Sequence, residues 1–164
     1  GIEFDGIFFI DDYFTIKPNI TFSSNKNSDY LTQFDGGLRN FGKTDISFSP
    51  NLIFGNSVEY NLNSKTLLFF NTKYVGKQYM SNTNVESSVL ASYLVNDLGL
   101  NYNFSIPGFS QDSEFKLLVN NLLNQKYESY GGHYFYDIDN KTYSGSYFYP
   151  MAEINFLLGL DVNF

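Results

Sequence analysis

The last nine residues of the chain, FLLGLDVNF (156–164), decide the fold. Apolar side chains occupy every second position of this segment, namely Phe156, Leu158, Leu160, Val162 and Phe164. Because successive side chains of a β-strand point to opposite faces, one face here is wholly apolar and the other is partly polar. Such a strand suits the closing position of a membrane barrel or the edge of a soluble sandwich, so the remaining sequence has to separate these two folds.

The composition favours strands and excludes several functions. Aromatic residues make up 20% of the 164 residues, and the chain has no Cys, so we expect neither disulfides nor a thiolate metal site. The formal net charge of −7 disfavours binding to nucleic acid. The sequence contains no apolar run of the roughly 20 residues that a membrane-spanning helix needs. It begins at Gly1 without a visible signal peptide, so we expect either a processed leader or a start partway through a longer protein.

Alternating segments like the last one recur along the whole chain. They cover approximately residues 2–10, 14–23, 46–61, 66–79, 93–104, 114–123 and 156–164. Pro18 falls inside the second segment, where it cannot donate a ladder hydrogen bond, so a β-bulge is expected there. The pattern predicts about seven long antiparallel strands.

The connections between these segments alternate strictly in length. Short connections cover about 11–13, 62–65 and 105–113, and long ones cover about 24–44, 80–92 and 124–151. Bacterial transmembrane barrels have short periplasmic turns and long extracellular loops, whereas a soluble sandwich has no reason to keep its long loops at one end. We therefore predict an all-β fold, a segment of an antiparallel transmembrane β-barrel. A small independent barrel with a structural or adhesive role and a soluble β-sandwich module are the alternatives.

Two motifs resemble TonB-dependent outer-membrane receptors. The segment LLVNNLLNQKY (117–127) resembles the penultimate-strand signature of that family through Asn121, Leu122, Asn124 and Tyr127, with Leu123 in place of the usual Phe. The ending YPMAEINFLLGLDVNF (149–164) is similar to the final strand of Bacteroidetes members. Together with weaker matches at residues 48–50 and 74–79, the resemblance extends over nearly the whole chain.

The resemblance implies that residues 1–164 are the C-terminal part of a barrel of about 22 strands, without its plug domain and earlier strands. It implies active import of a scarce nutrient through the outer membrane, with an iron-siderophore or cobalamin favoured over a glycan. The implied partners are the rest of the barrel, the plug, the TonB energy-transducing complex, the barrel-assembly machinery, the lipid bilayer and a surface lipoprotein. The C-terminus would be periplasmic. No cofactor and no enzymatic activity are expected.

Two groups of residues are candidates for specific roles. The alternating Phe156, Leu158, Leu160, Val162 and Phe164 are predicted to form the signal that the barrel-assembly machinery recognises. The connection at 128–148 is predicted to form an extracellular hairpin with an Asp–Asn turn, and its Tyr130, His133, Tyr134 and Tyr136 are candidate ligand contacts. A calcium site at 136–140 is rejected because the remaining oxygen ligands are missing.

Overall fold

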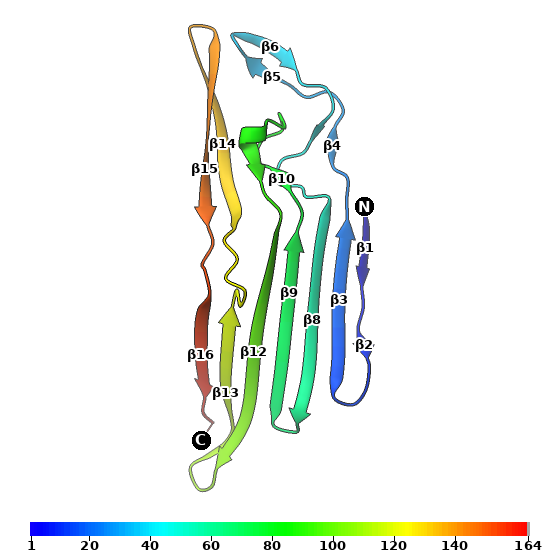
Figure 1. The fold of residues 1–164 in the computed structure, drawn as a ribbon, viewed down its shortest axis with the longest axis vertical. Helices are drawn as coiled ribbons and strands as arrows, with labels where there is room; N and C mark the ends of the chain where they lie inside the picture. The colour runs from blue at the N-terminus through cyan, green and yellow to red at the C-terminus, as the bar shows by residue number, and fades with distance from the viewer. Residues whose placement is uncertain (164) are drawn as a thin grey trace.

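The computed structural model describes residues 1–163, and its main feature is one antiparallel sheet (Figure 1). The sheet order is β1-β3-β8-β9-β12-β13-β16, with the short β2 pairing to β3 beside β1. The bounds are β1 Ile2–Asp5, β2 Phe8–Phe9, β3 Phe14–Phe22, β8 Leu52–Asn63, β9 Thr66–Val75, β12 Tyr93–Ile106, β13 Ser110–Asn120 and β16 Asn155–Asp161. Each strand pairs with its neighbour in the chain, so the predicted meander of seven long strands is confirmed when β1 and β2 are taken as one interrupted strand.

The alternation of short and long connections is also confirmed. Two residues join β8 to β9, and residues 107–109 join β12 to β13, whereas the chain between β3 and β8 covers residues 23–51. All the long connections lie at the upper end of the sheet in Figure 1, and the short turns lie at the lower end. We refer to these as the loop end and the turn end.

The long connections contain small elements of their own. The first holds β4 Lys26–Asn27, β5 Leu31–Phe34, β6 Gly37–Asn40 and β7 Thr44–Asp45, and the second holds β10 Gln78–Tyr79, the 3-10 helix η1 Glu86–Ser88 and β11 Val89–Leu90. The third forms the hairpin β14 Glu128–Ile138 and β15 Lys141–Pro150. Its turn residues Asp139 and Asn140 have φ angles of 51° and 58°, which a two-residue hairpin turn requires. The predicted Asp–Asn hairpin is therefore confirmed.

The structure corrects three expected details. The strand pairing on either side of Pro18 continues without a bulge. Instead, the edge strand is interrupted between β1 and β2, directly opposite Pro18, and Gly6 N there donates to Pro18 O at 3.0 Å. The missing N–H of Pro18 thus faces the edge of the sheet. β8 begins at Leu52 rather than near residue 46, because the backbone reverses at Phe48, whose φ is 54°. β13 ends at Asn120, because Asn121 has a φ of 50° that leaves the extended conformation.

One face of the sheet is an almost continuous apolar surface. Cross-strand pairing aligns a single apolar row across every strand: Phe8, Ile16, Val58, Phe70, Leu98, Val119 and Phe156. The opposite face carries most of the charged pairs, including Lys17 with Glu59 at 2.5 Å and Lys116 with Asp161 at 2.6 Å. No second layer covers either face within residues 1–163.

The buried hydrophobic residues of the described chain lie at the loop end instead of along the strands. Val75, Met80 and Leu90 are the buried hydrophobic side chains within residues 1–163, whereas large apolar residues of the sheet are exposed. A soluble sheet buries its apolar face against another layer, and an apolar exposed surface of this extent marks an interaction surface. The sheet therefore depends on its surroundings to cover its apolar face.

Candidate ligand-binding surface at the loop end

The tips of two hairpins from distant parts of the chain meet at the loop end (Figure 1). Asp35, at the tip of β5–β6, donates its N–H to Thr142 Oγ1 at 2.6 Å, and its carboxylate accepts the N–H of Thr142 at 2.8 Å. Phe34 also meets Phe135 edge to face, with the ring centroids 6.0 Å apart. This reciprocal pair of hydrogen bonds fixes the β14–β15 hairpin against the first long connection.

Ser146, which contacts His133, joins the same hairpin to the second long connection. The Nδ1 atom of His133 lies 2.7 Å from Ser146 Oγ on the paired strand, and Ser146 Oγ donates to the carbonyl of Ser87 in η1. The His133 ring contacts that of Phe135 edge to face, with the centroids 4.6 Å apart. Burial lowers the pKa of His133 below its ordinary value, because the charged imidazolium loses hydration there. The neutral ring is therefore the favoured form.

The four predicted ligand residues do not form one site. Alternation along β14 places Tyr130, Tyr134 and Tyr136 on one face of the hairpin, where they are about half-exposed. His133 lies on the opposite face, in contact with Ser146 and Phe135. The structure thus brings the three tyrosines together and separates His133 from them.

The sequence interpretation missed the second half of this tyrosine face. Tyr143, Tyr147 and Tyr149 come from β15, and the register sets Tyr136 opposite Tyr143 and Tyr130 opposite Tyr149. We call the six residues Tyr130, Tyr134, Tyr136, Tyr143, Tyr147 and Tyr149 the tyrosine face. Counting outward from a two-residue turn at Asp139–Asn140 would have predicted these pairs, because the turn length sets the register.

The family-motif residues have structural roles between β13 and β16. Asn121 is almost fully buried; its Nδ2 donates to the carbonyls of Gln125 and Ala152 at 2.9 and 3.1 Å, and its Oδ1 accepts the N–H of Gln125 at 2.9 Å. Asn124 Oδ1 accepts the N–H of Ile154 at 2.9 Å, and Leu122 N donates to Asn96 O at 2.7 Å. These bonds hold the start and the end of the third long connection together.

Tyr127 completes the motif by packing against the sheet. Its ring lies on that of Tyr93, with centroids 4.4 Å apart, and burial, followed by the charge of Asp97, raises its pKa. Beside it, a hollow of about 340 Å³ opens on the polar side of the sheet. Its lining includes Lys73, Asp97 and Asn120. The hollow combines one cation, one carboxylate and several amides, which suits contact with a polar protein segment.

The predicted assembly signal lies at the edge of the sheet. Phe156, Leu158 and Leu160 project from β16 on the apolar face, opposite Val119, Leu117 and Phe115, and all three are exposed. Val162 follows the end of the strand and is half-buried. Phe164 lies outside the described residues.

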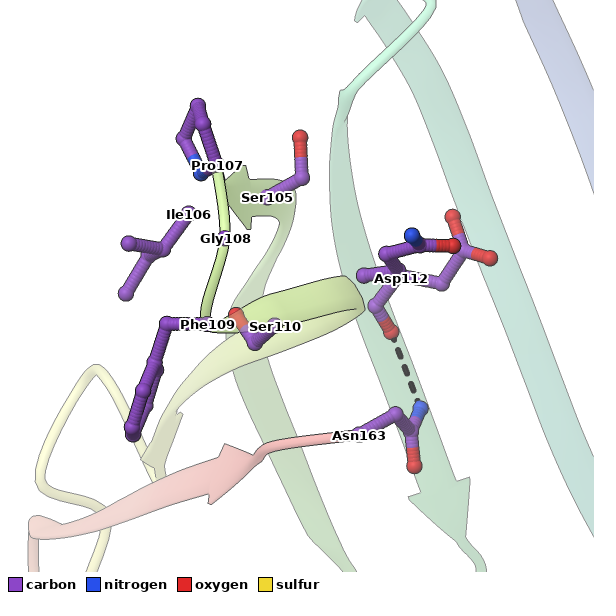
Figure 2. A pocket seen from close by; sticks show the side chains of 9 residues that line it. Ser105, Ile106, Pro107, Gly108, Phe109, Ser110, Asp112 and Asn163 are labelled. Carbon is purple, nitrogen blue, oxygen red and sulfur yellow. Dashed lines mark hydrogen bonds between the residues drawn. The ribbon is translucent and has the colours of Figure 1, made fainter.

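A second hollow, of about 880 Å³, lies at the turn end between the β12–β13 turn and the residues after β16 (Figure 2). Asn163 Nδ2 donates to the carbonyl of Asp112 at 3.1 Å, the contact drawn as a dashed line in Figure 2, and Gln111 N donates to Asn163 O at 3.0 Å. These bonds extend the pairing of β16 with β13. The lining holds a single charged side chain, Asp112, so we assign this hollow a structural role.

The described residues contain no group of three or more His, Cys, Asp or Glu side chains arranged to hold a metal ion. Within residues 1–163, no helix has the length and apolar character needed to cross a membrane.

Sheet topology, the two faces and the loop lengths define the class of fold: an antiparallel wall segment of a transmembrane β-barrel. Solved structures share this fold. The siderophore receptor PiuA from Acinetobacter baumannii aligns over 98% of this chain with a TM-score of 0.70 and 17% identity. The closed form of the ferric-catecholate import receptor Fiu from E. coli K12 aligns over 99%, with a TM-score of 0.68 and 19% identity. The ferric yersiniabactin uptake receptor FyuA from Yersinia pestis aligns over 99%, with a TM-score of 0.62 and 16% identity.

This chain spans only about a fifth of the length of those receptors, between 20% and 23%. No protein-family model matches the sequence, and no curated protein matches it either. The comparisons therefore establish a shared fold and do not establish the activity of the whole protein.

Proposed function

We propose that this chain forms part of the barrel wall of a TonB-dependent outer-membrane receptor that imports an iron-siderophore. The observation that carries the proposal is the apolar row that crosses every strand of a sheet whose fold matches the walls of iron-siderophore receptors. The Asn121-to-Tyr127 motif supports it, because those residues join the last two strands of the sheet.

Iron-siderophore import is favoured over cobalamin import by the kinds of protein that share the fold. PiuA is a siderophore receptor, Fiu a ferric-catecholate import receptor and FyuA a ferric yersiniabactin uptake receptor. None of these activities is enzymatic, which agrees with the expectation that this protein is a transporter and no enzyme.

The proposed setting is the outer membrane, with the long connections outside the cell and the C-terminus in the periplasm. The edges of the sheet support further barrel strands as partners, because unpaired backbone groups at a sheet edge are costly in lipid. The polar face, with the hollow beside Tyr127, would contact a plug domain. The remaining proposed partners are TonB, a surface lipoprotein and the barrel-assembly machinery, which would recognise the Phe156–Phe164 segment.

Uptake of radioactive iron in cells lacking the full-length protein tests this function. Complementation with the full-length gene is expected to restore uptake of one ferric siderophore from a chemically diverse panel, and loss of TonB should abolish that uptake. Cobalamin uptake is measured in parallel as the competing function. Unchanged accumulation of every ferric siderophore on deletion and complementation would overturn the proposal.

A further inference from the structure

The face of the β14–β15 hairpin opposite the tyrosine face packs on the two other long connections. Gly131, His133 and Phe135 alternate along β14 on this face. A Cβ atom at position 131 would be 2.6 Å from Met80 Sδ, and the ring of Phe135 meets that of Phe34 with the centroids 6.0 Å apart. His133 therefore lies between one contact with the second long connection and one with the first.

A single hydroxyl proton fixes which nitrogen of the His133 ring is protonated. The carbonyl of Ser87 can only accept, so Ser146 donates its one hydroxyl proton to that carbonyl. Ser146 Oγ then has only lone pairs to offer to His133 Nδ1, 2.7 Å away, so Nδ1 must carry a proton and donate it. A neutral imidazole that is protonated at Nδ1 has no proton at Nε2. The junction of Ser146 with Ser87 thus fits the neutral ring in one tautomer.

The surroundings of His133 Nε2 do not accommodate a proton. Within residues 1–163 this atom is inaccessible to solvent and has no hydrogen-bond partner. A second proton on the ring would create a charged N–H group there with neither water nor an acceptor, which is costly for a buried group. In the second long connection, η1 and β11 contact β14. Hydration of Nε2 thus requires the hairpin to separate from these elements.

No charged side chain is paired with this imidazole in the described part of the chain. Its hydrogen-bond partner is Ser146, and loss of hydration on burial is what lowers the pKa of His133. The other titratable or charged groups of the elements packed around it are Lys77, Tyr79 and Glu86 in the second long connection, Asp35 and Arg39 in β5–β6, Glu128, Asp137, Asp139 and Lys141 in the hairpin, and the six residues of the tyrosine face. We therefore assign the proton response of the junction to His133.

We propose that His133 is a pH-sensitive switch: uptake of one proton at Nε2 breaks the junction between Ser146 and Ser87 and frees η1 from the hairpin. The tip junction between Asp35 and Thr142 does not include His133 and should stay closed. In acid, the second and third long connections would separate while the first and third remain joined. The inference concerns how the loops are held together, so it stands apart from iron import.

Electron paramagnetic resonance of a single nitroxide label on the full-length protein in lipid vesicles tests the switch. The label is attached to Ser87→Cys in an otherwise cysteine-free protein, because the Ser87 side chain is exposed and its carbonyl is kept. The ratio of mobile to immobile label should rise between pH 7.5 and 5, mainly below about pH 6.5. The rise should not exceed about tenfold per pH unit, because one proton is taken up. A label at Leu38→Cys, exposed in β6, is the matched control and should keep its mobility.

Three variants in the Ser87→Cys protein separate the switch from a general loosening of the loops. His133→Asn places an amide N–H near the position of Nδ1 but does not titrate, so the label should stay immobile at every pH. Ser146→Ala removes the junction and should mobilise the label already at pH 7.5, whereas Glu86→Gln should leave the pH response unchanged. Heat-modifiable migration on gels confirms the folded barrel in each case. A pH response that is absent without these variants, kept in His133→Asn or lost in Glu86→Gln, or an immobile label in Ser146→Ala, would overturn the inference.

Discussion

The sheet and the loop end of this protein are stabilised in opposite ways. In the sheet, an apolar row from Phe8 to Phe156 is left without a covering layer, whereas at the loop end Met80 and Leu90 are buried and hairpin tips are joined by side-chain hydrogen bonds. A barrel wall that faces lipid makes its apolar contacts with the surrounding lipid chains, whereas loops that face water must make apolar contacts among their own residues. The two regions should therefore respond differently to the same kind of substitution.

The largest effect is expected from a charge placed on the apolar face. Phe70→Arg should destabilise the barrel in lipid by about 2–4 kcal/mol, since a cation near the bilayer midplane loses its hydration. Asn71→Arg, one residue along β9, is the matched control, because its side chain joins the polar face beside Asp97. Urea unfolding of the full-length protein in lipid vesicles measures both. Equal destabilisation by the two substitutions would mean that the faces of the sheet are not distinguished by lipid.

A smaller effect is expected at the junction between the two regions. Asn121→Ala removes three hydrogen bonds of a buried side chain and strains a backbone with φ of 50°, so a loss of about 2–3 kcal/mol is expected. Asn121→Gly removes the same bonds but accepts the positive φ, and it should be less destabilising than Asn121→Ala. Thermal unfolding of both variants tests the role of Asn121, which an unchanged midpoint for Asn121→Ala would contradict.

At the loop end itself, the expected effects are local. Thr142→Val keeps the shape of the side chain but removes the hydroxyl that accepts from Asp35 N, at an expected cost of about 1 kcal/mol. Hydrogen exchange should accelerate in residues 31–40 and 128–150 and remain unchanged in β9 and β12. Acceleration throughout the sheet would show that the two regions unfold together.

The smallest effect is a pH dependence at His133. Because burial lowers the pKa of His133 in the folded state, the unfolded hairpin binds more protons, and its stability should fall as the pH drops below about 6.5. The loss should be complete below the folded-state pKa. Proteolysis of the hairpin between pH 7.5 and 5 measures this, with His133→Gln expected to remove the dependence. A hairpin equally protected across that range would contradict the assignment.

The fold was predictable from the sequence to a large extent, because a two-residue period identifies strands that bury one face. The start of β8 and the end of β13 were not predictable. Positive φ angles at Phe48 and Asn121 interrupt the extended backbone within segments whose apolar and polar side chains still alternate. At Pro18 the missing N–H donor faces the edge of the sheet, so no bulge is needed. This outcome depends on which neighbouring strand the residue faces.

The candidate site was only half predictable. Tyr130, Tyr134 and Tyr136 share a face because of their spacing, and the same spacing places His133 on the other face. The interpretation grouped all four by nearness in sequence. The contribution of β15 depends on the register across the turn, which also sets Gly132 opposite Tyr147 and Gly145 opposite Tyr134. Such cross-strand pairs become visible only once the hairpin register is assigned.

Quenching by brominated acyl chains tests most directly whether one face of this sheet lies against lipid. Single cysteines, placed in turn along β9 and β12 of an otherwise cysteine-free full-length protein, would carry an environment-sensitive fluorophore in lipid vesicles. Positions 68, 70, 98 and 100 are predicted to be quenched strongly, and positions 71, 73, 97 and 101 weakly. Equal quenching at both sets, or quenching at neither, would contradict a transmembrane wall.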